Sequence, residues 1–317
     1  MSLLKTVLTG AVFSSMFVSL GANAANYPTH PITMVVPYGA GGTTDISARK
    51  LSSLAEAELG QPIVVENRPG GSGTNAMRAV ANAKKDGYTL IATTSSPLFV
   101  TPAVRPVGYD SVKDFTPILN YSGPNHGVLV QADSPYKSFD ELMAAAKSGT
   151  SISYGTAGAM GGPHLSFELI ARENKAKLKH VPFSGAGAAT AALLGGHVDV
   201  ALVPAYRDLV LDSKLRLLGV LDDSRDSDFT SVPTLKEAGY DVEFPSVVGV
   251  MAPAGTDPKI VAKLEATFTK VANSDEFKEF MTKLNQPVRV MTGKKLGETI
   301  KMNLETFREV AKELSQK

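Results

Sequence analysis

The sequence predicts an α/β fold with parallel sheets, and three observations point to it. Short apolar runs rich in β-branched residues alternate with amphipathic segments along most of the chain. Glycine-rich turns join these segments, and the composition, 43% hydrophobic and 20% charged, is that of an ordinary globular protein. With 317 residues the chain is long enough for one large domain or two ordinary ones. No linker separates two halves, so a two-domain chain must cross between its domains more than once.

The first 24 residues stand apart as a predicted secretory signal peptide. Lys5 supplies a positive charge, residues 7–20 are almost entirely apolar or small, and Ala22-Asn23-Ala24 places small residues where a signal peptidase cleaves. The alternative, a transmembrane anchor, is disfavoured because the run is shorter than the ~20 residues that a spanning helix needs. No cysteine follows the run, so a lipid anchor is excluded. We expect cleavage after Ala24 and export of a soluble protein.

The expected strands and helices follow in order from residue 32. The run Ile32–Val36 predicts a strand, and a helix is expected over 45–59, where apolar residues recur at helical spacing. A second helix is expected near 74–82, and Ser138 with Glu141 makes a capping box for a helix that reaches Lys147. From residue 257 onward the pattern is mainly helical, with Thr292 capping the last helix. Further strands are expected at 63–66, 89–93, 152–154, 179–181, 198–203, 215–220 and 247–252.

Charge and cysteine content exclude several classes of protein. The 32 Lys and Arg against 31 Asp and Glu give a net charge of +1, without the basic surface that a nucleic-acid binder needs. The same balance argues against a polybasic membrane-surface protein. The absence of cysteine removes disulfides, thiol catalysis and thiolate metal sites together. We therefore expect no nucleic-acid partner and no metal.

Two glycine loops predict an anion site. Residues 37–45 and 154–164 each join a strand to a helix, and glycine lets backbone amides approach a ligand while the helix N-terminus offers unpaired N–H groups. Asp45 or Thr44 is expected to cap the first of these helices. Two such N-termini facing each other would clamp an anion, with Ser95 and Ser96 adding hydroxyl groups. The alternative for each loop is a tight turn without a ligand.

The remaining motifs give weaker evidence for a cofactor or for catalysis. Gly71-x-Gly73-x-x-Ala76 formally resembles a dinucleotide fingerprint, but residues 90–95 lack the acidic residue that this motif requires at the next strand end, so we expect no cofactor. There is no G-x-S-x-G elbow and no H-E-x-x-H spacing, so we expect no enzyme. His164, at a helix start, is interpreted as a capping residue or a ligand contact. Arg49 is interpreted as an internal ion-pair partner or a carboxylate contact, and Asp199 as structural.

Several segments, in this order and spacing, resemble one known family. They are PYGAGGTTD (37–45) continuing to Ala48-Arg49, VENRPG (65–70), DGYTL (86–90), HVPF (180–183) leading to LGGHVD (194–199), PTLKEAG (233–239) and APAGT (252–256). Over essentially the whole chain after the signal peptide, the sequence resembles the solute-binding proteins of the tripartite tricarboxylate transporter group, the Bug family.

The resemblance implies a type II periplasmic-binding-protein-like "Venus flytrap" of two α/β lobes joined by two crossings. One lobe would span 26–122 plus 226–317 and the other 123–225. It further implies a monomer in the periplasm that captures a small carboxylate, a di- or tricarboxylate or an aromatic acid, by hinge closure. The carboxylate would be delivered to the membrane permease subunits of a tripartite transporter. The alternatives are a ligand-sensing adaptor for a signalling partner, and an exported hydrolase that uses His164 and a serine.

The family's ligand contacts, carried over residue by residue, give the candidate site. Asp45 is expected to organise its loop rather than touch an anion. Met160 and Gly161 stand where the family often has glycine and serine, and the tryptophan often found near 244–249 is absent, so we expect a carboxylate with a partly apolar or aromatic body. The candidate residues are Tyr38, Ala40, Gly41, Gly42, Asp45, Asn67, Ser95 and Ser96 in one lobe, and Thr156, Ala157, Gly158, Met160, His164, Phe183 and Asp199 in the other.

Overall fold

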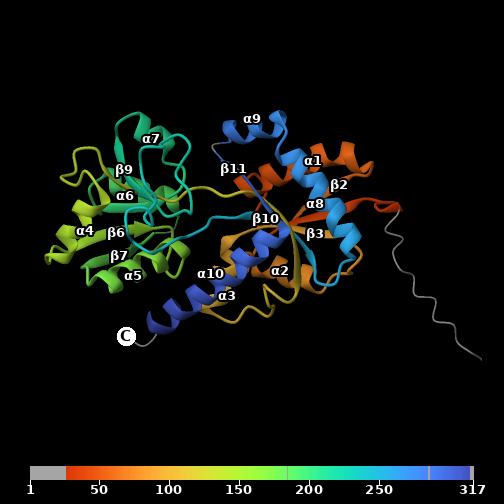
Figure 1. The fold of residues 1–317 in the computed structure, drawn as a ribbon, viewed down its shortest axis with the longest axis horizontal. Coiled ribbons are helices and arrows are strands. Elements are labelled where there is room, and N and C mark those ends of the chain that lie inside the picture. The colour runs from red at the N-terminus through yellow and green to blue at the C-terminus, as the bar shows by residue number, and fades with distance from the viewer. Residues whose placement is uncertain (1–25, 184, 285, 315–317) are drawn as a thin grey trace, which may run out of the picture.

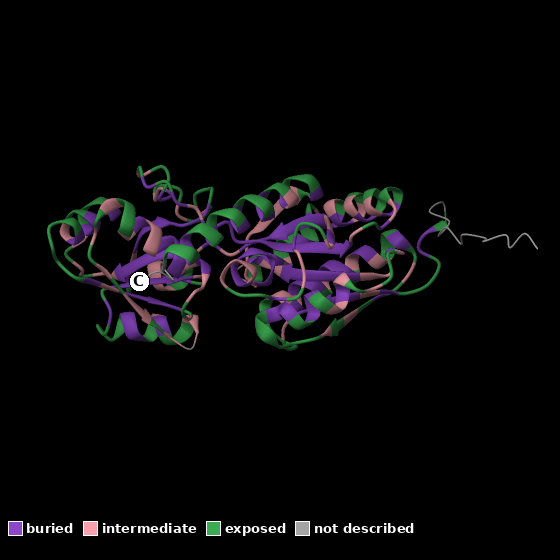
Figure 2. Cartoon of the chain, turned by 90° about the horizontal axis from the view of Figure 1, so that it is seen from below, coloured by how far each residue is buried: buried purple, intermediate pink, exposed green. Residues whose placement is uncertain are grey.

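The protein consists of two α/β lobes that lie side by side along its long axis (Figure 1). The computed structural model describes residues 26–183, 185–284 and 286–314, so the predicted signal peptide and its cleavage site lie outside the described residues. One lobe is built on a six-stranded sheet and the other on a five-stranded sheet. In both lobes the central strands are the most buried elements and the helices expose one face (Figure 2).

The first lobe holds strands from both ends of the chain. Its sheet has the order β11-β4-β10-β3-β1-β2, in which β1, β2 and β3 are parallel while β10 runs antiparallel to both β3 and β4. The strands are β1 (Ile32–Val36), β2 (Ile63–Asn67), β3 (Thr89–Thr94), β4 (Phe115–Ser122), β10 (Val248–Pro253) and β11 (Val288–Thr292). The helices are α1 (Thr43–Leu59), α2 (Thr74–Ala81), α3 (Thr101–Val104), α8 (Pro258–Ala272), α9 (Asp275–Lys283) and α10 (Gly293–Leu314), with short turns η2 (Gly71–Gly73) and η3 (Ser96–Val100).

The second lobe repeats this plan with fewer strands. Its sheet has the order β7-β6-β8-β5-β9, with β6, β7 and β8 parallel and β5 antiparallel to β8 and β9. The strands are β5 (Gly127–Gln131), β6 (Ile152–Thr156), β7 (Leu178–Pro182), β8 (Val200–Val203) and β9 (Leu215–Val220), and the helices are α4 (Phe139–Lys147), α5 (Gly162–Asn174), α6 (Ala186–Leu194) and α7 (Arg207–Leu211). The predicted Ser138 cap of α4 is present, with its hydroxyl accepting from the Glu141 N–H at 3.2 Å.

The prediction of parallel sheets holds for only part of each sheet, and the reason lies in the crossings. A strand that follows a crossover helix runs parallel to its predecessor. The strands β5 and β10 instead enter their sheets directly from the other lobe, without a crossover helix, and both run antiparallel to their neighbours. Each lobe is therefore a mixed sheet whose parallel half carries the strand–loop–helix units.

Two crossing segments, 123–126 and 244–247, join the lobes and touch each other. Val248 pairs with Ser122 in the sheet, and a Cβ placed on Gly123 would lie 1.9 Å from the Ser246 carbonyl oxygen. The return crossing comes later than the predicted boundary at residue 226. Residues before it pack on the second lobe: Thr234 forms a β-bridge with Val220, and Tyr240 donates to Asp140 at 3.1 Å.

The C-terminal helix α10 is a third connection between the lobes. It packs on β4 and α3 of the first lobe and also contacts α5 of the second (Figure 1). Its buried residues recur every three or four positions, as expected of an amphipathic helix that covers a core. An ion pair between Arg172 of α5 and Glu313 of α10 lies at the far end of the helix. The buried face consists of Leu296, Ile300, Leu304, Phe307 and Val310.

The backbone contact at Gly123 predicts a sharp dependence on side-chain size. Gly123→Ala places a methyl group against the Ser246 carbonyl oxygen, so we expect the free energy of unfolding to fall by about 1–3 kcal/mol in urea denaturation. The matched control is Gly187→Ala, an exposed position in α6 where a Cβ meets nothing within 4 Å. That change should be neutral or stabilising by about 0.5–1 kcal/mol. Equal effects of the two substitutions would contradict the close approach of the crossings.

Candidate ligand-binding site

A cavity of about 320 Å³ lies between the lobes, and both lobes and both crossings line it. This is the lower end of the volume range of small-molecule sites. The described residues that line it come from both lobes and from the crossings. The first lobe provides Thr43, Thr44 and Ser47 of α1, Thr94, Ser95, Ser96 and Val100 at and after the end of β3, Val248 at the start of β10, and Gln286. The crossings provide Pro124, His126, Phe244, Ser246 and Val247, and the second lobe provides Ala157, Gly161, Gly162 and Pro163.

The N-terminus of α1 forms one wall of the cavity. Its N-cap is Gly42, in an extended conformation (φ −77°, ψ 162°), and among the described residues no side chain caps this helix. The expected capping by Thr44 or Asp45 is therefore wrong. Asp45 instead reaches back along the loop and accepts from the Gly41 N–H at 2.9 Å. The first amides of α1 thus remain available at the cavity wall.

Asp45 is the centre of a network that holds the first glycine loop. Its other oxygen accepts from Asn67 at 2.8 Å and pairs with Arg49 at 2.9 Å, while Asn67 also donates to the Tyr38 carbonyl at 3.0 Å. Burial alone raises the pKa of Asp45, but hydrogen bonds from Arg49, Gly41 and Asn67 hold that pKa below its ordinary value. Arg49 is accordingly an internal ion-pair partner, and Asp45 organises its loop as expected.

The N-terminus of α5 forms the facing wall and repeats this construction. Its N-cap is Gly161 (φ −84°, ψ 164°), again with no side-chain cap among the described residues. His164 Nδ1 accepts from the Met160 N–H at 3.0 Å, four residues back, as Asp45 does with Gly41. Met160 and Gly41 both have positive φ, 57° and 83°. The two loops therefore have the same backbone course, and His164 is a loop-capping residue.

Further contacts fix the His164 loop from beneath. The His164 ring stacks on His180 with centroids 3.8 Å apart, and Thr156 contacts both His180 Nε2 and the Gly158 carbonyl, at 2.8 and 2.7 Å. Burial lowers the pKa of His164, which Glu168 partly opposes, and burial together with His164 lowers the pKa of His180 to about 4. At neutral pH His164 is therefore uncharged and its Nδ1 is free to accept.

The predicted residues fall into three groups: those that line the cavity, those that form or support its loops, and two that lie away from it. Ser95, Ser96 and Ala157 line the cavity itself. The side chains of Tyr38, Asp45, Asn67, Thr156 and His164 form or support the two loops. The remaining candidates, Ala40, Gly41, Gly42, Gly158 and Met160, belong to the loops themselves, and Ala40, Gly41 and Gly42 are exposed. Direct contact of these residues with a ligand stays a prediction.

Two predicted residues lie away from the lining. Asp199 is bonded to Ser153 near the start of β6, at the opposite end of the sheet from the Ala157 loop, because it precedes β8 rather than following it. The Phe183 ring packs over Gly155, where an added Cβ would lie 2.9 Å from it. The interpretation of Asp199 as structural agrees with these contacts.

The crossings supply wall residues that no sequence motif indicated. The Phe244 ring lies where a Cβ on Gly162 would come within 1.9 Å, and it also contacts Phe99 and Phe307 of the first lobe, with centroids 6.3 and 5.9 Å away. His126 meets Phe244 edge to face and shares a 3.1 Å hydrogen bond with Ser246. In the sequence, only the absence of the family's tryptophan near Phe244 drew attention to this crossing.

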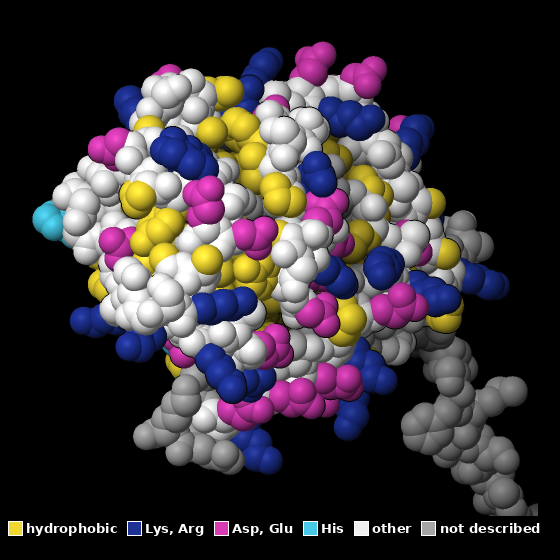
Figure 3. Space-filling view, turned by 60° about the vertical axis from the view of Figure 1, so that its left-hand side comes forward, with side chains coloured by type: hydrophobic (Ala, Val, Ile, Leu, Met, Phe, Trp, Pro, Cys, Tyr) yellow, Lys and Arg dark blue, Asp and Glu magenta, His cyan; other side chains and the backbone are white. Residues whose placement is uncertain are grey.

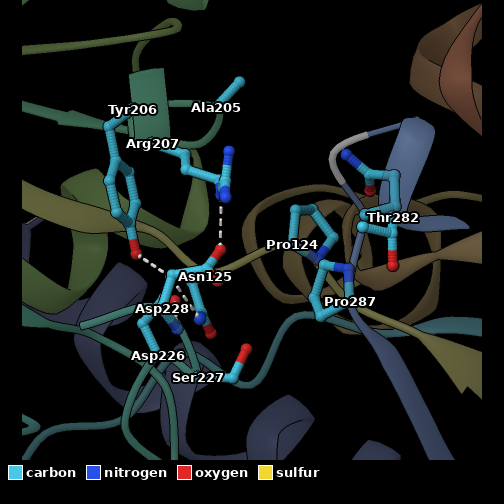
Figure 4. A pocket seen from close by; sticks show the side chains of 11 residues that line it. Pro124, Asn125, Ala205, Tyr206, Arg207, Asp226, Ser227, Asp228, Thr282 and Pro287 are labelled. Carbon is cyan, nitrogen blue, oxygen red and sulfur yellow. Dashed lines mark hydrogen bonds and ion pairs between the residues drawn. The ribbon is translucent and has the colours of Figure 1, made fainter. Parts of the chain in front are cut away.

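On the other side of Pro124, a polar network ties the crossings to both lobes. Arg289 of β11 binds the buried Asp222 at 2.7 Å and also Asn125. Asn125 and Tyr206 both donate to Asp226, at 2.9 and 2.6 Å, and these groups border a second cavity of about 160 Å³ (Figure 4). Burial raises the pKa of Asp222 to about 7 against the opposing effect of Arg289.

The described residues include no group of three or more His, Cys, Asp or Glu that could hold a metal ion. Within the same part of the chain, none of the helices is both long enough and apolar enough to cross a membrane. The face of the second lobe in Figure 3 carries Lys and Arg interspersed with Asp and Glu, without a large area of one sign.

The two lobes, the two crossings and the cavity between them define the chain as a solute-binding protein of the periplasmic-binding-protein fold. The sequence profile described as "Tripartite tricarboxylate transporter family receptor" matches residues 47–315. The chain belongs to this family.

Curated relatives cover most of the chain. The "UPF0065 protein in gbd 5'region" of Cupriavidus necator is 40% identical over 266 residues, 83% of this chain and 81% of that protein. "Protein BugT" of Bordetella pertussis is 34% identical over 271 residues, 84% of this chain and 83% of that protein. The resemblance to the Bug family is thereby confirmed.

Solved structures show the same fold with and without ligands. A TctC solute-binding protein from Polaromonas, described as having no ligand, superposes with a TM-score of 0.85 at 29% identity, over 90% of this chain and 99% of that one. A Rhodopseudomonas palustris protein with adipate gives 0.71 at 29% identity, over 90% and 97%. MatC of the same organism, with bound malate, gives 0.69 at 30% identity, over 90% and 100%.

The His164 contact predicts a pH-dependent loop. The folded-state pKa of His164 lies below its ordinary 6.5, so the contact with Met160 is fully present above that pH and is lost as the pH falls through the folded value. His164→Asn offers an amide oxygen in place of Nδ1 and does not titrate. We expect the melting temperature of the unsubstituted protein to fall further than that of this variant between about pH 7 and 4.5.

Both proteins keep His126 and His180, so the difference between their profiles reports the titration of His164 together with its effect on the pKa of His180. Glu168, Tyr154 and His180 face the same imidazole and are unchanged in the variant. Parallel melting profiles for the two proteins would show that the Met160 contact does not depend on the protonation of His164.

Proposed function

We propose that this chain is exported to the periplasm, captures a small carboxylate in the interlobe cavity by hinge closure, and delivers it to the membrane subunits of a tripartite tricarboxylate transporter. One observation carries the proposal: the N-termini of α1 and α5, neither capped by a described side chain, border the same cavity from opposite lobes. Family membership and relatives with adipate and malate support the class of ligand.

The physical basis is the positive end of each helix. Each N-terminus carries roughly half an elementary charge and up to four N–H groups without a partner in the helix. A carboxylate that reaches both termini replaces its water with these donors and is shared between the lobes. The hydroxyls of Thr43 and Thr44 on the α1 wall add further donors, whereas that of Ser95 donates to the Pro245 carbonyl. Attraction of an anion therefore needs no net positive charge on the protein.

The arrangement of the lobes supports a hinge. This chain superposes better on the Polaromonas protein without ligand, at 0.85, than on the proteins with adipate and malate, at 0.71 and 0.69, although all three are 29–30% identical to it. Equal identity and unequal superposition are expected if the two lobes sit at different angles. We infer that the present arrangement is the open one.

The histidines at the cavity argue against the alternative of a hydrolase. His126 and Ser246 form a serine–histidine pair 3.1 Å apart, but burial lowers the pKa of His126 to about 4. An imidazole of that pKa is a weak base at neutral pH. His164, the other candidate base, has Nδ1 engaged by the Met160 N–H and Nε2 facing Glu168 at 3.8 Å.

Removal of one helix amide tests the proposed site directly. Thr43 is the first residue of α1, and proline is well tolerated there while lacking the N–H. Thr43→Pro should weaken carboxylate binding in isothermal titration by about 1.5–3 kcal/mol, roughly 10- to 100-fold. The titrated ligand is whichever of malate, adipate, citrate, aspartate, hexanoate and benzoate raises the melting temperature most.

The matched control is Asp275→Pro, the first residue of α9, which does not line the cavity. This variant should bind the ligand as the unsubstituted protein does. Loss of binding in both variants, or in neither, would contradict the placement of the carboxylate at α1. If none of the six acids stabilises the protein, the proposed ligand class is wrong.

A further inference from the structure

The charges around the cavity restrict the class of carboxylate that it can bind. This inference rests on the proposed function. Among the described residues that line the cavity there is no Lys, Arg, Asp or Glu. Its titratable wall residue is His126, which is hydrogen-bonded to Ser246 and packed against Phe244. Burial keeps this imidazole neutral at physiological pH by lowering its pKa to about 4. The positive field in the cavity therefore comes from backbone dipoles alone.

The two helix ends together compensate about one negative charge. Each contributes roughly half an elementary charge of positive sign, so the single negative charge of one carboxylate between α1 and α5 balances both ends together. A second carboxylate buried in the same cavity would lack a partner, and an unpaired buried charge is strongly unfavourable. In the first turn of α1 the charge of Asp45 is paired with that of Arg49, and the counterpart of Asp45 in α5 is the neutral His164, so neither residue adds net charge to the helix end.

The rest of the wall suits a neutral body. Phe244, Val100 and Val247 supply apolar surface, and the hydroxyls of Thr94, Ser96 and their neighbours supply neutral hydrogen-bonding groups. We propose that this cavity selects carboxylates with one negative charge and a neutral, partly apolar body, in preference to the dicarboxylates found with relatives. The carboxylate lies at the helix ends, and the neutral body faces the crossings.

Matched ligands test the proposal, because they differ in one end group only. The probes are three series in which the second group is a carboxylate, an amide or absent: succinate, succinamate and butyrate; adipate, its monoamide and hexanoate; terephthalate, its monoamide and benzoate. Titration calorimetry at pH 8 keeps every carboxyl group ionised. In the series that binds best, we expect the monoanions to bind at least about tenfold more tightly than the dianion.

A second measurement uses an added cation. Thr44→Lys places an ammonium group on the cavity wall, and Thr44→Gln is a control of similar length without charge. The Lys variant should bind the dianion at least about tenfold more tightly than the Gln variant, while hexanoate or benzoate changes less. This gain shows that the cavity discriminates by the charge of the ligand and not by its shape alone.

The outcomes separate the two claims. A dianion that binds the unsubstituted protein as tightly as its monoamide, or more tightly, overturns the single-charge inference and leaves the proposed carboxylate site intact. If no acid of the three series binds, the proposed function fails, and the inference fails with it. Tighter binding of the monoanions together with the gain in Thr44→Lys supports the inference.

Discussion

In both lobes, the third residue of a helix uses its side chain to hold the loop before the helix rather than to cap the helix. Asp45 accepts from Gly41 and His164 accepts from Met160, each four residues back. This backward bond fixes a turn of positive φ followed by an extended glycine N-cap. Because a cap would occupy the first amides of the helix, the two helix ends remain able to bind an anion only while these bonds hold. The proposed binding of a carboxylate depends on them.

The crossings place the two helix ends opposite each other. Gly123 and Ser246 bring the crossing segments into backbone contact, and Phe244 packs against the first residue of α5 on one side and against Phe99 on the other. Such contacts leave little space for a side chain in the crossings, so a few residues there set the position of one lobe relative to the other. The interlobe helix α10 adds a link between the lobes, and the proposed closure requires it to slide or bend.

Much of this was visible in the sequence, and the missing parts have physical reasons. The glycine loops before α1 and α5 indicated that these two helix N-termini face one site, because glycine and strand–helix spacing are local signals, and the structure places both beside the same cavity. The family resemblance implied that Asp45 organises its loop, whereas its bond to Gly41 in place of a helix cap was not expected, since it depends on Asn67 of β2 as well as on Arg49 one turn further along α1. Strand β4 escaped notice because Pro117 and Asn120 interrupt its apolar pattern. Wall residues such as His126 lie in crossings, which have no periodicity.

The central claim is that a carboxylate held at both helix ends draws the lobes together. Small-angle X-ray scattering of the purified protein, with and without a saturating concentration of the carboxylate that stabilises it most, measures this directly. The account predicts a smaller radius of gyration with ligand, because the lobes rotate about the crossings onto the bound anion. An unchanged scattering curve, with calorimetry showing the ligand bound, would contradict it.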